Sequence, residues 1–154
     1  MPTSPKAVRA KRIEHVADHL LGHVALLARL LIREVRGDIS RTEASVLTAL
    51  TGGPRRITEL AELEGLAQPT MTLLIQRLEQ RGWVERRRHP EDGRVALISV
   101  TDRGRAALEQ FQGQIRAVLR THMDAMSDDE VAALETATDA LRSLLDAVQG
   151  EAAS

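Results

Sequence analysis

Residues 57–101 read ITELAELEGLAQPTMTLLIQRLEQRGWVERRRHPEDGRVALISVT, and this segment contains the most specific signals for the fold. Its first half carries apolar residues at helical spacing in two runs, 59–64 and 68–80. Gly65 lies between the runs, where a left-handed turn costs glycine little. Pro69 suits the first turn of the second helix, because no backbone N–H is needed there. The spacing therefore predicts two short helices joined by a tight turn.

The second half of the stretch predicts a β-hairpin. Residues 83–87 and 95–100 contain β-branched residues and are predicted to be short strands. The polar turn between them contains Pro90 and the pair Asp92-Gly93. Helix, turn, helix and hairpin in this order are typical of a winged helix-turn-helix, which places its second helix in the major groove of DNA. We therefore predict a mainly α fold with a small β-hairpin wing.

Further helices flank this unit. The patterns Ser40–Glu43 and Ser127–Glu130 are capping boxes, in which the serine and the glutamate satisfy backbone N–H groups left free at a helix start. Ile57 is predicted to be a short strand residue, and Thr58 is predicted to cap the helix at 59–64. The flanking helices are predicted at 7–35, 41–50, 102–125 and 128–148.

The length of 154 residues suits one domain, residues 1–154, with a sizeable core. Within it we expect residues 38–101 to form the winged helix-turn-helix lobe. The helices within 7–36 and 102–148 are too apolar to be isolated surface helices. We expect them to form a dimerisation region that pairs two copies of the chain.

Composition excludes several classes of protein. The absence of cysteine excludes a disulfide framework, a thiolate metal site and a cysteine redox switch. The sequence shows no 18-residue run free of polar residues and no signal-peptide pattern, so we expect a cytoplasmic protein without a membrane segment. It also lacks a glycine-rich phosphate loop, a nucleophile elbow and an HExxH motif. We therefore expect neither an enzyme nor a cofactor.

The net charge of −1 conceals an uneven distribution. Residues 1–36 carry seven basic and three acidic residues, a net of +4, whereas residues 121–154 carry one and eight, a net of −7. Residues 81–94 carry five arginines and three acids, a net of +2. A protein that bound nucleic acid through its overall charge would be basic throughout. Any nucleic-acid contact is therefore expected to use a local patch.

The outward face of the helix at 68–80 is the candidate for reading bases. Glutamine pairs with adenine, threonine contacts bases or phosphates, and arginine suits guanine or phosphate. Asp92 is placed to orient Arg94 by an ion pair, and the hairpin loop is expected to contact the backbone or the minor groove. The candidate DNA-binding residues are Gln68, Thr70, Thr72, Leu73, Gln76, Arg77, Arg88, His89 and Arg94.

Two other interpretations of the same pattern stay open. The segment could be a small α+β unit with a solvated arginine-rich loop, since charge runs are usually solvated. A winged helix could also serve as a protein-interaction module, which predicts no salt-dependent binding to duplex DNA.

Three histidines recur every four residues on the first predicted helix: His15, His19 and His23. Residues four apart share a helix face, so a neighbouring pair could bind a metal ion. All three span about 12 Å at 1.5 Å per residue, which is too far for one ion. We predict no metal site. The alternatives are a polar edge at a dimer interface and a role in binding a ligand.

The chain resembles the MarR (multiple-antibiotic-resistance regulator) family of bacterial transcription regulators. The resemblance covers nearly the whole chain and is carried by TEASVLTAL, by the helix-turn-helix, and above all by HPEDGRVALISVTDRGRAAL. In the last stretch Asp92, Arg94, Thr101 and Gly104 match the family pattern Asp-x-Arg, strand, Thr-x-x-Gly. The resemblance implies a homodimer that binds a palindromic operator in double-stranded DNA, usually as a repressor released by a small anionic or phenolic effector.

Three residues depart from the family pattern. Ala67 replaces a frequent serine or threonine cap, at a cost of about 1 kcal/mol of helix stability. Leu73 replaces a common polar or basic residue, so that a base contact there would be apolar, as with a thymine methyl group. Gly93 replaces a frequent arginine, which leaves one fewer phosphate contact and a more flexible wing tip.

Overall fold

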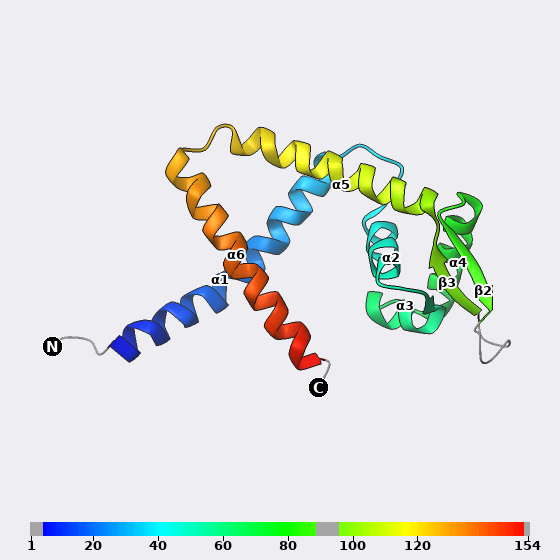
Figure 1. Ribbon diagram of the computed structural model, residues 1–154, viewed down its shortest axis with the longest axis horizontal. Helices are drawn as coiled ribbons and strands as arrows, with labels where there is room; N and C mark the ends of the chain where they lie inside the picture. Colours follow the sequence, from blue (N-terminus) through cyan, green and yellow to red (C-terminus); the bar gives the residue numbers. More distant parts are fainter. Residues whose placement is uncertain (1–4, 89–95, 153–154) are drawn as a thin grey trace. The chain divides into compact units, whose positions relative to one another are not determined.

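The computed structural model describes residues 5–88 and 96–152 of the chain (Figure 1). Contacts divide the chain into two compact units, with the boundary after Arg116. In chain order, the elements within the described residues are α1 (Pro5–Glu34), α2 (Arg41–Thr51), β1 (Arg55–Arg56), α3 (Ile57–Glu64), α4 (Gln68–Gln80), β2 (Val84–Arg88), β3 (Ala96–Val100), α5 (Asp102–Met123) and α6 (Asp128–Ala152).

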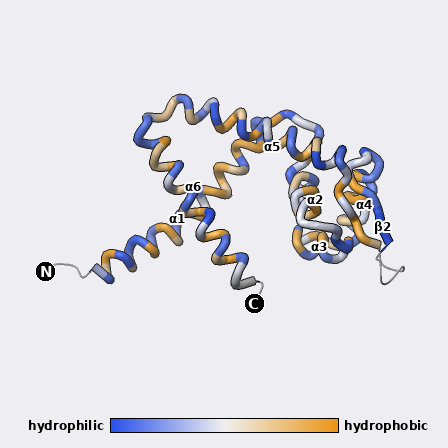
Figure 2. Tube along the Cα trace, viewed as in Figure 1, coloured by the Kyte–Doolittle hydropathy of each residue, from blue (hydrophilic) through white to orange (hydrophobic). Residues whose placement is uncertain are grey.

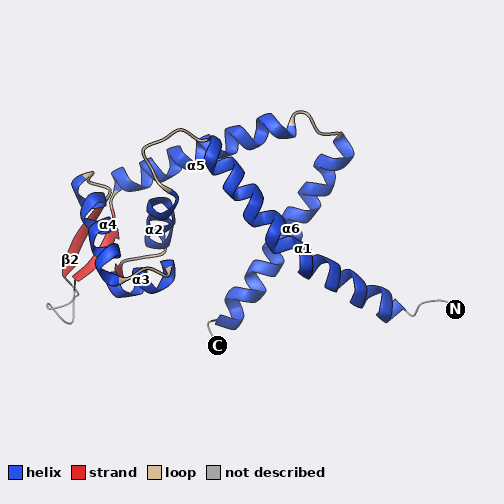
Figure 3. Cartoon of the chain, turned by 180° about the vertical axis from the view of Figure 1, so that it is seen from behind, coloured by secondary structure: helices blue, strands red, loops and turns tan. Residues whose placement is uncertain are grey.

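The core of the first unit lies where α2, α3 and α4 pack on the sheet (Figure 3). It is aliphatic, as expected of a chain with one tryptophan and one phenylalanine. Its fully buried side chains are Val46, Leu47, Leu50, Leu60, Met71, Ile75, Leu78 and Ile98. The helix-turn-helix is therefore one face of a packed lobe.

The sheet has three antiparallel strands in the order β1-β3-β2. The hairpin pairs Val84 with Val100 at one end and Arg88 with Ala96 at the other. The predicted fold class, mainly α with a small β-hairpin wing, is confirmed.

Two predicted capping boxes and one predicted turn are confirmed by their hydrogen bonds and backbone angles. Ser40 Oγ accepts a hydrogen bond from Glu43 N at 3.2 Å, and Glu43 Oε2 accepts one from Ser40 N at 2.8 Å. The second box, at Ser127 and Glu130, has the same reciprocal bonds. Gly65 adopts φ 62°, the left-handed conformation of the tight turn.

The expectations for Ile57 and Thr58 were wrong. The first strand is Arg55–Arg56, and Ile57 is the first residue of α3. Arg56 N–H donates to Glu59 Oε2 at 2.8 Å, so a glutamate in the first turn satisfies the helix start that Thr58 was expected to cap. The strand lies earlier because β3 pairs with Arg55 and Arg56.

Other element boundaries also differ from the predictions by one to four residues, including those of β2, α5 and α6. Strand β2 begins at Val84, because Trp83 N–H closes the end of α4 by donating to Leu78 O at 2.9 Å. Helix α5 ends at Met123, two residues before the predicted end. Helix α6 continues to Ala152, beyond the predicted end at residue 148.

Helices α1 and α6 expose many apolar side chains. Figure 2 colours the hydrophobic residues along these helices orange. By length and composition alone, α1 could cross a membrane, and it is the one such helix in the described part of the chain. This qualifies the expectation of no membrane segment, although a helix that buries its apolar side against other protein has the same composition. The large exposed hydrophobic residues of α1 are Val8, Ile13, Val16, Leu21, Val24, Leu26, Leu27 and Leu30. Those of α6 are Val131, Leu134, Leu144, Leu145 and Val148.

The junction between the hairpin and α5 explains the Thr-x-x-Gly motif. Thr101 Oγ1 donates to Gly82 O at 2.6 Å and accepts from Gly104 N at 3.1 Å. A Cβ added at Gly104 would overlap the carbonyl oxygen of Trp83 and lie 3.0 Å from Val100 Cγ2. A side chain at position 104 would therefore push α5 away from the hairpin.

We predict that Gly104→Ala lowers the free energy of unfolding by about 2 kcal/mol or more, because the neighbouring backbone must move. Gly113→Ala is the matched control in α5, since its Cβ would meet only the flexible end of Arg116, at 3.8 Å. The control should gain up to about 1 kcal/mol from helix propensity. Urea denaturation followed by circular dichroism measures both changes. Equal stabilities for the two variants would contradict the role given to Gly104.

Candidate nucleic-acid interface

One apolar stripe fixes the orientation of α4. Met71, Leu74, Ile75 and Leu78 recur at helical spacing and are at most 4% exposed. Because these side chains enter the core, the opposite side of the helix must face outward. The lobe thus presents one side of α4 to solvent.

The outward side contains most of the residues predicted to bind DNA. Thr72 is half-buried, and its hydroxyl donates to Gln68 O at 2.9 Å, so in this arrangement it can only accept a further hydrogen bond. The other five predicted residues of α4 are exposed: Gln68, Thr70, Leu73, Gln76 and Arg77.

Ion pairs divide the arginines near α4 into two groups. Arg86 Nε donates to both carboxylate oxygens of Glu79 at 3.0 Å, which ties β2 to the end of α4. Arg87 Nε donates to Glu85 Oε1 at 2.6 Å. Arg77 and Arg88 are exposed and have no ion pair with any residue that the structure describes. These two cations are therefore available for a phosphate.

Two of the predicted wing residues, His89 and Arg94, lie outside the described residues, as does the proposed orienting partner Asp92. Their roles stay predictions. Arg88, the last residue of β2, is placed at the base of the wing.

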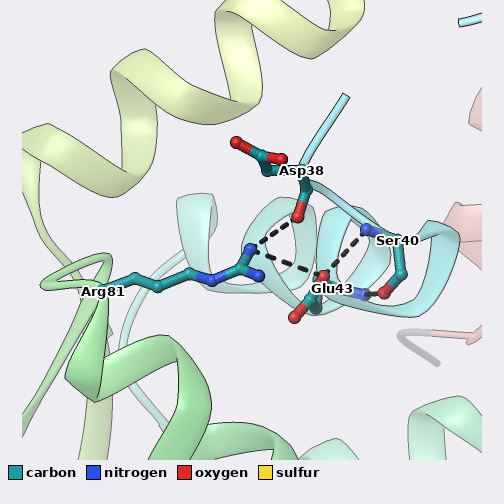
Figure 4. A network of polar contacts seen from close by, with 4 residues as sticks. All are labelled: Asp38, Ser40, Glu43 and Arg81. Atoms are coloured by element: carbon teal, nitrogen blue, oxygen red, sulfur yellow. Dashed lines mark hydrogen bonds and ion pairs between the residues drawn. The ribbon is translucent and has the colours of Figure 1, made fainter. Parts of the chain in front are cut away.

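A polar network that the sequence did not predict holds the far end of α4 (Figure 4). Arg81 Nη1 donates to Asp38 O at 2.6 Å and lies 3.9 Å from Glu43 Oε2. The guanidinium also stacks over Trp83, 4.7 Å from the ring centroid. Arg81 therefore connects the end of α4 with the loop and capping box that precede α2, across 43 residues of chain.

The three histidines of α1 are exposed and form a ladder. The rings of His15 and His19 lie 4.5 Å apart and those of His19 and His23 6.1 Å apart. His19 Nδ1 lies 2.8 Å from His15 O, so the tautomer protonated at Nδ1 donates to that carbonyl. Among the described residues, no group of three or more histidines and acids is arranged to hold a metal ion.

An open cavity of about 490 Å³ lies beside the Arg81 network. Its lining includes one cationic and one acidic residue, two aromatic rings and two amides, and the three histidines are not part of it. The lining residues are Arg36, Gly37, Asp38, Ile39, Trp83, Ala107, Gln110, Phe111 and Gln114.

Comparisons with known proteins agree on one family. Residues 39–96 match the MarR family. YpoP of Bacillus subtilis, an uncharacterized helix-turn-helix transcriptional regulator, is 26% identical over 128 residues, which cover 77% of this chain and 91% of YpoP. The transcriptional repressor YetL of B. subtilis is 39% identical over 75 residues, or 46% of this chain and 45% of YetL. The crystal structure of a MarR mutant from E. coli is 25% identical and superposes with a TM-score of 0.63 over 85% of this chain and 94% of that one.

We predict that Arg81→Met lowers the free energy of unfolding by about 1–2 kcal/mol. Glu43 is 5% exposed, and without Arg81 its buried carboxylate would have no cation beside it. Arg87→Met is the matched control, since both partners of its ion pair are exposed, and it should change stability by less than about 0.5 kcal/mol. Urea denaturation measures both variants. Equal losses would show that the network does not hold the end of α4.

Proposed function

This chain belongs to the MarR family of helix-turn-helix transcriptional regulators, and from that premise we propose that it is a cytoplasmic, homodimeric repressor of a palindromic operator. The observation that carries the proposal is the outward side of α4, where exposed amide, hydroxyl and guanidinium groups lie opposite a fully buried stripe. A major groove about 12 Å wide admits such a helix and offers donors and acceptors that match these groups.

The apolar surfaces of α1 and α6 support dimerisation. Each helix leaves at least five large hydrophobic side chains exposed in the single chain. An exposed apolar surface of this extent marks an interface, since water contact with it is costly. We assign these surfaces to a second copy of the chain, so residues 7–36 and 102–148 would form the dimerisation region.

A dimer determines how the operator is read. Two copies of α4 would enter successive major grooves with centres about 10 base pairs apart. Arg77 and Arg88, which lack ion pairs within the described residues, would contact phosphates beside each half-site. His89 and Arg94 of the wing would bind the neighbouring backbone or minor groove.

Repression and its release are proposed from two observations. YetL, which matches 46% of this chain, is named a transcriptional repressor. The cavity beside Trp83 is lined by Arg36, Asp38 and two aromatic rings. Arg36 would bind the anionic or phenolic oxygen of a small effector, and the rings would pack on its apolar part. A ligand there would contact both α5 and the loop before α2, and would thereby shift the spacing of the two lobes. The histidine ladder is retained as a second, separate candidate for a ligand contact.

Selection of bound duplexes from a random DNA pool tests the proposal as a whole. We expect recovery of sites with two-fold symmetry and half-site centres about 10 base pairs apart, bound with a strong salt dependence. Sedimentation should show two chains per duplex. No enrichment, together with no salt-dependent duplex binding, would favour the protein-interaction module instead.

Single substitutions should separate phosphate contacts from base contacts. Arg94→Ala should weaken binding to all sequences alike and reduce the salt slope by about one per half-site. Gln76→Ala should instead relax the preference at particular bases and leave the slope unchanged. Lys6→Ala, in the first turn of α1 and outside the proposed dimerisation region, removes one positive charge and should change neither. Electrophoretic shifts between 50 and 200 mM salt make the comparison, and an unchanged slope for Arg94→Ala would contradict the wing assignment.

A further inference from the structure

The outward side of α4 carries one large apolar side chain, Leu73, which is 62% exposed. The other large hydrophobic residues of this helix enter the core. A single leucine on a protein surface is ordinary. Its significance here comes from its position on the helix that we propose enters the groove.

Leu73 occupies the middle of that surface. Residues three and four positions away on a helix are its neighbours on the same face. For Leu73 these are Pro69 and Thr70 on one side and Gln76 and Arg77 on the other, and all four are exposed. A groove that receives the polar neighbours must therefore receive Leu73 as well.

The chemistry of leucine leaves few partners in a major groove. Its side chain has no hydrogen-bond donor or acceptor, so it can neither pair with a base edge nor satisfy a polar atom that it covers. The one apolar group on the major-groove edge of the four DNA bases is the C5-methyl group of thymine. Thr72 cannot donate a hydrogen bond to a base edge in this arrangement, because its hydroxyl proton is already donated to Gln68 O.

We propose that Leu73 determines specificity by reading the C5-methyl group of a thymine in each half-site. The inference rests on the proposed function and deepens it. The contact buries two apolar groups against each other, and at other bases Leu73 would cover a polar edge without replacing its hydrogen bonds. Each half-site should therefore prefer thymine at the base pair under the middle of α4.

Replacing thymine with uracil tests this contact alone, because deoxyuridine lacks the methyl group but keeps the same pairing and the same O4 acceptor. The probe is the duplex recovered by selection, with deoxyuridine placed at one thymine at a time. We expect one position in each half-site at which uracil weakens binding about fourfold, and about 15-fold when both half-sites carry it, the effect of one methyl group each.

Leu73→Ala assigns the effect to this residue. The variant should bind thymine and uracil duplexes equally. In a double-mutant cycle, removing the methyl group should weaken binding by the unsubstituted protein but not by the variant, which shows that the leucine and the methyl group contact each other. Leu63→Ala is the matched control, since Leu63 is 59% exposed on α3. It should keep the preference for thymine. Both leucines are exposed, so both variants are expected to fold.

Three outcomes separate the hypotheses. Loss of the thymine preference in Leu73→Ala, with duplex binding retained, supports the proposal. Equal binding of thymine and uracil by the unsubstituted protein, or a preference that persists in Leu73→Ala, overturns it and leaves operator binding in place. Absence of any duplex binding by the unsubstituted protein overturns the proposed function together with this inference.

Discussion

The burial of one side of α4 is the constraint on which the rest depends. Met71, Leu74, Ile75 and Leu78 fill the lobe core, and exposing any of them would cost about 1.5–3 kcal/mol. Rotation of α4 about its axis would expose all four together, so the helix has one stable orientation. The packing of these buried residues therefore determines which side chains of α4 face outward and can contact a partner.

The surroundings of α4 keep that orientation rigid. Arg86 joins β2 to Glu79 near the end of the helix, and Arg81 joins the same end to Asp38. After the hairpin, Thr101 forms a hydrogen bond to Gly82 O at the start of α5. Because Gly104 has no Cβ, the first turn of α5 can pack directly against the backbone of Trp83. A helix held from several sides loses little freedom when it binds, which favours affinity.

Local signals explain how much could be predicted from the sequence. The stripe of α4, the capping box at Ser40 and the turn at Gly65 each depend on residues within a few positions, and each was correctly predicted. The first strand was predicted at Ile57 and lies instead at Arg55–Arg56, because only its pairing with β3 defines its position. The contacts of Arg81 with Asp38 and of Arg86 with Glu79 were missed for the same reason, since spacing along the chain gives no sign of them. In the candidate site, the outward residues of α4 were predicted from the helical periodicity of the sequence. That Arg77 and Arg88 can bind a phosphate became clear only from the structure, in which Arg86 and Arg87 form ion pairs and these two, within the described residues, do not.

A dimethyl sulfate footprint on a selected duplex tests whether α4 enters the major groove, because this reagent methylates guanine N7 in the major groove and adenine N3 in the minor groove. If α4 enters the major groove twice per operator, guanine N7 atoms should be protected in two blocks whose centres lie about 10 base pairs apart. Protection of adenine N3 alone, or a single block of guanine protection, would show that α4 does not enter the major groove twice per operator.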